Sequence, residues 1–345
     1  MVSAPEEQNP LLERRHAVDL ALRAHVERAS VSGLPLYRMM QYQLGWVDRD
    51  GLELPTSDAP RTYGSLTAEA ALAVDPRAGA EHAGAAVELF YESTCVHEEM
   101  QTGEAGGDLT PAVWWIWGPA QAINVGDGLH ALARLAILRL RDQGASPDAT
   151  LNAMSVLDDL ALRYYEGQYI ELTYQERIDI TSEQYSTMAR SKRGALLGGA
   201  AALGARSAGA PVATCDAFWE LGSAIGEAAQ VQADMDSLWG SAPKPPGRVL
   251  NKSKLYPVVD VLERGTLAQK RAVGTIYFKR VIESPDVAEI ARLLDDAGAH
   301  QRAQTRVAEL TAEATDKLEA ITQEPDARER WRAIIQGLVN GAGAS

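Results

Sequence analysis

The chain has 345 residues, 46% hydrophobic and 23% charged, a balance that excludes the disordered and fibrous classes. Its formal net charge of −14 excludes a general nucleic-acid binder, because such a field repels phosphates. The two cysteines, Cys95 and Cys215, are too few for a disulfide framework and fit a reducing compartment. Because the N-terminus lacks a secretory signal and no apolar run is long enough to cross a membrane, we expect a cytoplasmic protein without transmembrane segments.

Helical periodicity runs through almost the whole chain. Apolar residues recur at three- and four-residue spacing, and no alternating run bounded by turn signals is present. The pattern predicts helices over residues 12–30, 35–46, 66–74, 79–101, 119–142, 150–173, 183–208, 214–239, 255–264, 267–282, 285–297 and 299–321. We therefore predict an all-α fold with a single domain over residues 13–337, and loose tails at residues 1–12 and 338–345.

Motifs of polar and charged residues follow one another along this helical chain. They are EEMQT at 98–102, GQYIEL at 167–172, MARSK at 188–192, GEAAQVQADMDSLWG at 226–240, KP at 244–245 and NKSKLYP at 251–257. In order and spacing these motifs resemble those of the trans-isoprenyl diphosphate synthases, the polyprenyl synthetase family. The family's counterparts are DDxxD, GQxxDL, MxxxKT, GxxxQxxDDxxDxxG and the basic loop beyond it.

The resemblance implies a fold and a chemistry. The fold is an isoprenoid-synthase bundle of about a dozen helices around a central apolar cavity, and family members are usually homodimers. In this family an allylic prenyl diphosphate ionises, and Mg²⁺ held by carboxylates neutralises the leaving diphosphate. The groups implied as catalytic are Glu98, Glu99, Asp234, Gln168 and Gln230, the two glutamines facing the cavity. The three carboxylates among them are also the implied Mg²⁺ ligands.

The resemblance also implies a binding site for the donor diphosphate and a pocket for its chain. The cations implied at the diphosphate are Lys192, Lys244, Lys252 and Lys254. Tyr91 stands where the family has a pocket histidine or glutamine, and Trp117 either lines the pocket or packs in the core. Ser93 and Thr94 are small where short-chain synthases place bulky aromatics, which implies a donor of fifteen carbons or more.

The chain departs from the family pattern in both metal-binding motifs. Thr102 stands in place of the third aspartate of the first motif, and it brings no charge. In the second motif Ala233 replaces the leading ligand and Ser237 the last aspartate. Because hard cations such as Mg²⁺ need several oxygen ligands, we do not expect the full three-magnesium cluster of the family.

The acceptor side departs further, since the positions that hold isopentenyl diphosphate in the family carry Asp58, Arg61, Tyr91, Gly107 and Asp108. Only Arg61 is a cation, and carboxylates repel a diphosphate. We therefore predict a class I terpene synthase that ionises an allylic prenyl diphosphate without isopentenyl diphosphate as acceptor. The alternatives are a prenyltransferase to another acceptor, or a non-catalytic subunit of a heteromeric prenyl diphosphate synthase.

Overall fold

The computed structural model describes residues 9–55, 59–107, 109–240, 247–322 and 324–341. Within these ranges all regular structure is helical, and only two isolated β-bridges occur, Val47 with Glu53 and Gly106 with Pro111. The predicted all-α fold is thus confirmed, with helices up to α16 instead of about a dozen.

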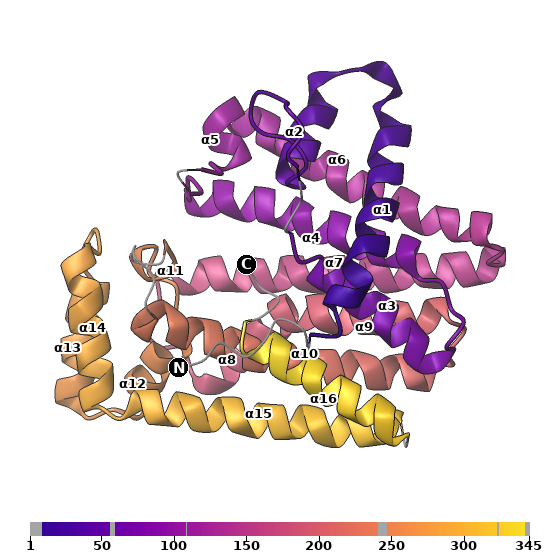
Figure 1. Cartoon of the computed structure of the whole chain (residues 1–345). Helices are drawn as coiled ribbons and strands as arrows, with labels where there is room; N and C mark the ends of the chain where they lie inside the picture. Colours follow the sequence, from indigo (N-terminus) through magenta and orange to yellow (C-terminus); the bar gives the residue numbers. More distant parts are fainter. Residues whose placement is uncertain (1–8, 56–58, 108, 241–246, 323, 342–345) are drawn as a thin grey trace. The chain divides into compact units, whose positions relative to one another are not determined.

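The described chain divides into two compact units, and each is described by itself. The first comprises described residues up to Asp159 together with Gly199–Trp219. Its helices are α1 (Leu12–Ala29), η2 (Ser30–Ser32), α2 (Pro35–Gln43), α3 (Thr62–Val74), α4 (Glu81–Thr102), α5 (Val113–Trp117), α6 (Pro119–Leu138) and η3 (Arg139–Gln143) (Figure 1).

The second unit comprises Leu160–Gly198 and the described residues from Glu220 onward. Its helices are α8 (Ser182–Ala189), the π-helix η4 (Arg190–Gly194), α11 (Gly247–Leu250), α12 (Tyr256–Arg264), α13 (Leu267–Tyr277), α14 (Ser284–Asp296), α15 (Ala299–Ile321) and α16 (Pro325–Val339). Three further helices contribute residues to both units: α7 (Pro147–Tyr174), α9 (Ala195–Ser207) and α10 (Val212–Trp239).

Helices α3 and α4 form a closely packed pair in the first unit. A β-carbon added at Gly64 would lie 2.8 Å from the carbonyl oxygen of Gly84, and one added at Gly84 would lie 2.7 Å from that of Gly64. The two backbones can approach this closely only because neither residue has a side chain. Most of α4 up to Val96 is buried, so the helix is anchored firmly before it reaches Glu98 and Glu99.

A second close approach, in the second unit, fixes the segment that carries Lys192. A β-carbon at Gly167 of α7 would lie 2.7 Å from the carbonyl carbon of Ser191, and one at Gly226 of α10 would lie 2.4 Å from the α-carbon of Gly194. Helices α7 and α10 therefore both press against η4. A π-turn inside a helix is rare and frequently occurs at functional sites.

The two ends of the described chain are helical. Helix α1 begins at Leu12, and α16 ends at Val339, where Leu338 and Val339 are buried. The predicted domain bounds at 13 and 337 stay a prediction. No helix among the described residues has the length and apolar character needed to cross a membrane.

Candidate functional site

A chain of buried charges in the second unit contains three of the predicted site residues. Lys192 Nζ lies 2.5 Å from Glu171 Oε2, and Arg248 Nη2 lies 2.9 Å from the other oxygen of Glu171. The other end of the guanidinium, Arg248 Nη1, lies 2.5 Å from Asp234 Oδ1. Gln230 Nε2 donates to the same oxygen over 3.1 Å. Lys192, Gln230 and Asp234 are therefore joined through Glu171 and Arg248.

The motifs assigned no role to Glu171 or Arg248. Glu171 has a signal in the sequence, because it is the acid of the GQYIEL motif, whereas Arg248 has none beyond its place in a basic region. Burial disfavours the charged form of Glu171, but Lys192 and Arg248 reverse this effect and hold its pKa at about 2. Burial likewise opposes the charge on Arg248, and Asp234 and Glu171 outweigh it and raise its pKa.

Both carboxylate oxygens of Asp234 are fully used by hydrogen-bond donors. Asp234 has no exposed surface. Its Oδ2 accepts from Tyr185 Oη at 2.5 Å and from the backbone N–H of Tyr256 at 2.8 Å. Its Oδ1 accepts from Arg248 and Gln230. The carboxylate is thus neutralised and saturated by protein groups.

This arrangement of the second motif does not fit a magnesium ion. Ala233 has no ligand atom, and Ser237 Oγ donates to the carbonyl oxygen of Ala233 at 2.8 Å. Among the described residues no cluster of three or more His, Cys, Asp or Glu side chains is placed to hold a metal. A metal could reach Asp234 only if Arg248 moved away. Asp234 as a metal ligand therefore stays a prediction.

The first motif, at the end of α4, keeps one feature that a cation fits. Glu99 Oε2 is buried and has no hydrogen-bond partner. Burial and the nearby carboxylates of Glu92, Glu104 and Glu98 raise the pKa of Glu99 to about 7. Thr102 Oγ1 donates to the carbonyl oxygen of Glu98 at 2.8 Å, so its hydroxyl is hydrogen-bonded within α4. Glu98 and Glu99 as metal ligands stay a prediction.

The remaining donor-site lysines differ in their surroundings. Lys254 is buried, and its Nζ donates to the carbonyl oxygens of Gln175 at 2.8 Å and Lys252 at 3.1 Å. Burial and the charge of Lys252 lower the pKa of Lys254 to about 8. Because Gln175 follows Glu171 by four residues, Lys254 and Lys192 meet the same end of α7. Lys244 lies outside the described residues.

Gln168, predicted to be catalytic, and the predicted pocket residues are found on three helices. Gln168 lies on α7 and is 6% exposed. Ser93 and Thr94 are buried on α4, and their hydroxyls donate to carbonyl oxygens of the same helix. The Tyr91 ring lies 4.4 Å from that of Tyr63, measured between ring centroids. The Trp117 ring, on α5, meets the ring of Tyr42 edge-on at 5.1 Å. Their roles in binding a prenyl chain stay predictions.

Arg61, the cation that remains at the predicted acceptor positions, is bonded to other residues of the first unit. It is 2% exposed. Its Nη2 donates to the carbonyl oxygen of Leu44 at 2.6 Å, its Nε to Asp19 at 2.9 Å, and its Nη1 lies 3.4 Å from Glu92. Its φ of 49° is unusual for a residue with a side chain. Asp58 and Asp108 lie outside the described residues.

Comparison with known proteins gives a consistent result. A family model described as "Polyprenyl synthetase" matches residues 63–294. A geranylgeranyl diphosphate synthase of Mycobacterium tuberculosis is 30% identical over 297 residues, which cover 85% of this chain and 84% of that protein. A (2E,6E)-farnesyl diphosphate synthase of the same species is 26% identical, covering 82% of this chain and 80% of the relative. The crystal structure of a polyprenyl synthetase from Streptomyces coelicolor superposes with a TM-score of 0.85 at 26% identity, covering 95% and 98% of the two chains.

These relatives contradict one prediction. They are named as synthases of prenyl diphosphates, for which isopentenyl diphosphate is the family's acceptor. The predicted terpene synthase that works without isopentenyl diphosphate is therefore wrong. The prediction rested on the residues at positions 58, 91 and 108, and a few substituted positions do not determine what a whole pocket binds. Two of these three positions fall within the family match.

Proposed function

The chain belongs to the polyprenyl synthetase family, and on that premise we propose that it is a prenyltransferase acting on an allylic prenyl diphosphate. The observation that carries this proposal is the meeting of Lys192 and Lys254 at one end of α7, with Arg248 beside Lys192 through Glu171. Three cations from two segments, two of them buried lysines, form a site suited to the oxygens of a diphosphate.

Each proposed residue has a physical task in prenyl transfer. The bond between the donor's first carbon and its diphosphate breaks, so negative charge accumulates on the diphosphate and positive charge on the allylic carbon. Lys192 and Lys254, with Lys252 and Lys244, bind and neutralise the diphosphate. Gln168 and Gln230 offer neutral amide groups beside the reacting chain. Before the donor arrives, Glu171 holds Lys192 in position.

Magnesium is part of the proposal only at the first motif. The ion, when bound, would supply positive charge, and Glu98 and Glu99 would hold it. The orphaned oxygen of Glu99 supports this assignment. We further propose a donor of fifteen carbons or more, on the small side chains of Ser93 and Thr94, and a cytoplasmic homodimer by analogy with the family.

Product analysis tests the proposed activity. The purified protein is incubated with geranyl, farnesyl or geranylgeranyl diphosphate, with isopentenyl diphosphate and Mg²⁺. We expect release of diphosphate and an elongated prenyl product, with the two longer donors used best. Neither release nor a transfer product from any donor, while the protein stays folded, would contradict the proposal.

A second candidate, a non-catalytic subunit of a heteromeric synthase, is favoured by the saturated carboxylate of Asp234. A chain with this function gives no product alone but changes the rate or product length of a catalytic synthase chain. Adding such a chain from the same genome to the assay separates the two candidates. Product formed by this chain alone excludes the second.

The pH dependence of donor binding gives a prediction for Lys254. Its pKa of about 8 means that it is charged below pH 8 and progressively neutral above it. Phosphate groups are already fully ionised there, since their second pKa is about 6. Affinity for a prenyl diphosphate should therefore be nearly constant at pH 7 and lower, begin to fall near pH 8, and approach a tenfold loss per pH unit above it.

Calorimetric titration between pH 7 and pH 9.5 measures this fall. Lys254→Met should remove it and lower the affinity at pH 7, whereas the matching prenyl alcohol should show no such fall in either protein. A wild-type affinity that stays constant up to pH 9.5 would show that Lys254 does not touch the diphosphate.

A further inference from the structure

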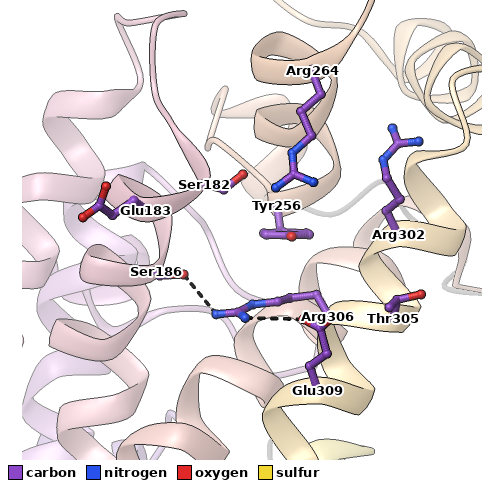
Figure 2. Close-up of a pocket in the computed structure, with 9 residues that line it drawn as sticks. All are labelled: Ser182, Glu183, Ser186, Tyr256, Arg264, Arg302, Thr305, Arg306 and Glu309. Carbon is purple, nitrogen blue, oxygen red and sulfur yellow. Dashed lines mark hydrogen bonds and ion pairs between the residues drawn. The ribbon is translucent and has the colours of Figure 1, made fainter.

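A cavity of about 490 Å³ opens in the second unit between α8, α12 and α15 (Figure 2). Its lining consists of Ser182, Glu183, Ser186, Tyr256, Arg264, Arg302, Thr305, Arg306 and Glu309. None of these is a predicted donor-site residue. In Figure 2 the guanidinium of Arg264 points toward the Tyr256 ring, and Arg306 extends below that ring. The volume is in the range of small-molecule sites.

Two of the three lining arginines share one buried acid. Asp260 has a side chain that is 1% exposed, and its Oδ2 lies 2.5 Å from Arg302 Nη2. Arg264 Nε lies 3.8 Å from the other oxygen, and the Arg264 side chain is 60% exposed. Arg302 is therefore fixed by Asp260, whereas Arg264 has only a long and exposed ion pair. Its N–H donors can turn to a ligand in the cavity.

The third arginine is held in a similar way by another buried acid. Glu227 is fully buried, and its two oxygens lie 2.7 Å from Arg306 Nη2 and 2.6 Å from Arg190 Nε. Ser186 Oγ also donates to Glu227 at 2.6 Å. Here too, one carboxylate faces two guanidinium groups. Asp260 and Glu227 thus anchor four arginines with two negative charges, and three of the four line the cavity.

Two lining carboxylates reduce the positive charge at the cavity. Glu183 and Glu309 line it, and Glu309 lies 3.6 Å from Arg306 Nη1 with a side chain that is 61% exposed. Water and salt screen the exposed Glu309 carboxylate more than the less exposed guanidinium groups of Arg302 and Arg306. Removing the Glu309 charge should therefore strengthen an anion site, and removing the Arg264 charge should weaken it.

We propose that this cavity binds a small molecule through a phosphate or diphosphate group. Guanidinium groups form paired hydrogen bonds with phosphate oxygens, and three arginines line this cavity. The flat ring of Tyr256 contacts the rest of the molecule. The site is distinct from the donor site, although the backbone N–H of Tyr256 donates to Asp234 and so links the two.

Titration of the full chain at constant ionic strength tests this site with three probes: inorganic phosphate, inorganic diphosphate and farnesyl diphosphate. The variants are Arg264→Gln and its matched opposite Glu309→Gln, both at exposed positions. We expect diphosphate binding to weaken about tenfold in R264Q and to strengthen about two- to fivefold in E309Q. Lys192→Gln alters only the donor site, so the affinity of diphosphate for this cavity should be the same as in the wild type.

The probes also identify the source of the phosphate group. Farnesyl diphosphate that binds this site more tightly than inorganic diphosphate supports an ester as the ligand, and equal affinity supports the free anion. Equal affinities in the wild type, R264Q and E309Q would overturn the proposal. So would loss of all diphosphate binding in Lys192→Gln, because the binding would then belong to the donor site alone.

Discussion

Replacement of Asp234 by asparagine is expected to lower the free energy of unfolding by about 3–5 kcal/mol. The carboxylate is fully buried and accepts from Tyr185, Tyr256, Gln230 and Arg248. Asparagine keeps the size of the side chain but loses the negative charge that compensates the Arg248 guanidinium. In addition, its NH2 group is itself a hydrogen-bond donor, and it would face groups that also donate. Chemical denaturation of the wild type and D234N at pH 7 measures the loss.

Asp236→Asn provides the matched control, because it makes the same chemical change two residues away. Asp236 is exposed, and its side chain accepts only an exposed hydrogen bond from Gln232, at 2.9 Å. Its loss should change the stability by less than about 0.5 kcal/mol. If D234N proved no less stable than D236N, Asp234 would not be the centre of a buried network.

Replacement of Lys192 by alanine is expected to weaken the binding of a prenyl diphosphate by about ten- to a hundredfold. A charge-assisted contact between an ammonium group and a phosphate oxygen contributes about 1.5–3 kcal/mol. The loss should lie near the lower end, because the diphosphate must compete with Glu171, 2.5 Å from Lys192 Nζ. Isothermal titration with farnesyl diphosphate measures the change.

Two comparisons separate binding from folding in this experiment. Farnesol lacks the diphosphate, so its affinity should be nearly the same in the wild type and K192A. Lys192→Arg keeps the charge and should recover part of the lost affinity. Equal losses for farnesol and farnesyl diphosphate would show that Lys192 only supports the fold.

The helical pattern predicted the fold class but not every helix. One helix was expected over residues 183–208, and the structure is helical there without a break, as α8, η4 and α9; only the π-helical turn η4 was not predicted. The π-turn lies where Gly167 of α7 and Gly226 of α10 each approach η4 closely. Both glycines are distant from η4 in the sequence. Helix α16 was missed, although Pro325 at its first position and the spacing of Trp331, Ile334 and Leu338 are helical signals.

The candidate site was predictable only as far as its motifs reach. The order and spacing of the motifs located Lys192, Gln230 and Asp234, which the structure joins in one network. The pairing partners were not readable, because Arg248 could have paired with any acid of a strongly acidic chain. Only the folded arrangement of α7, α10 and α11 selects Glu171 and Asp234.

The most direct test of the central claim, a charged site for a donor diphosphate, is a calorimetric comparison of farnesyl diphosphate and farnesol on the wild-type chain at pH 7. Lys192 and Lys254 should make the diphosphate bind at least about a hundredfold more tightly than the alcohol, since two charge-assisted contacts contribute about 3 kcal/mol or more. R264Q should keep this preference. Equal affinity for the two ligands, or no binding of any prenyl diphosphate, would contradict the claim.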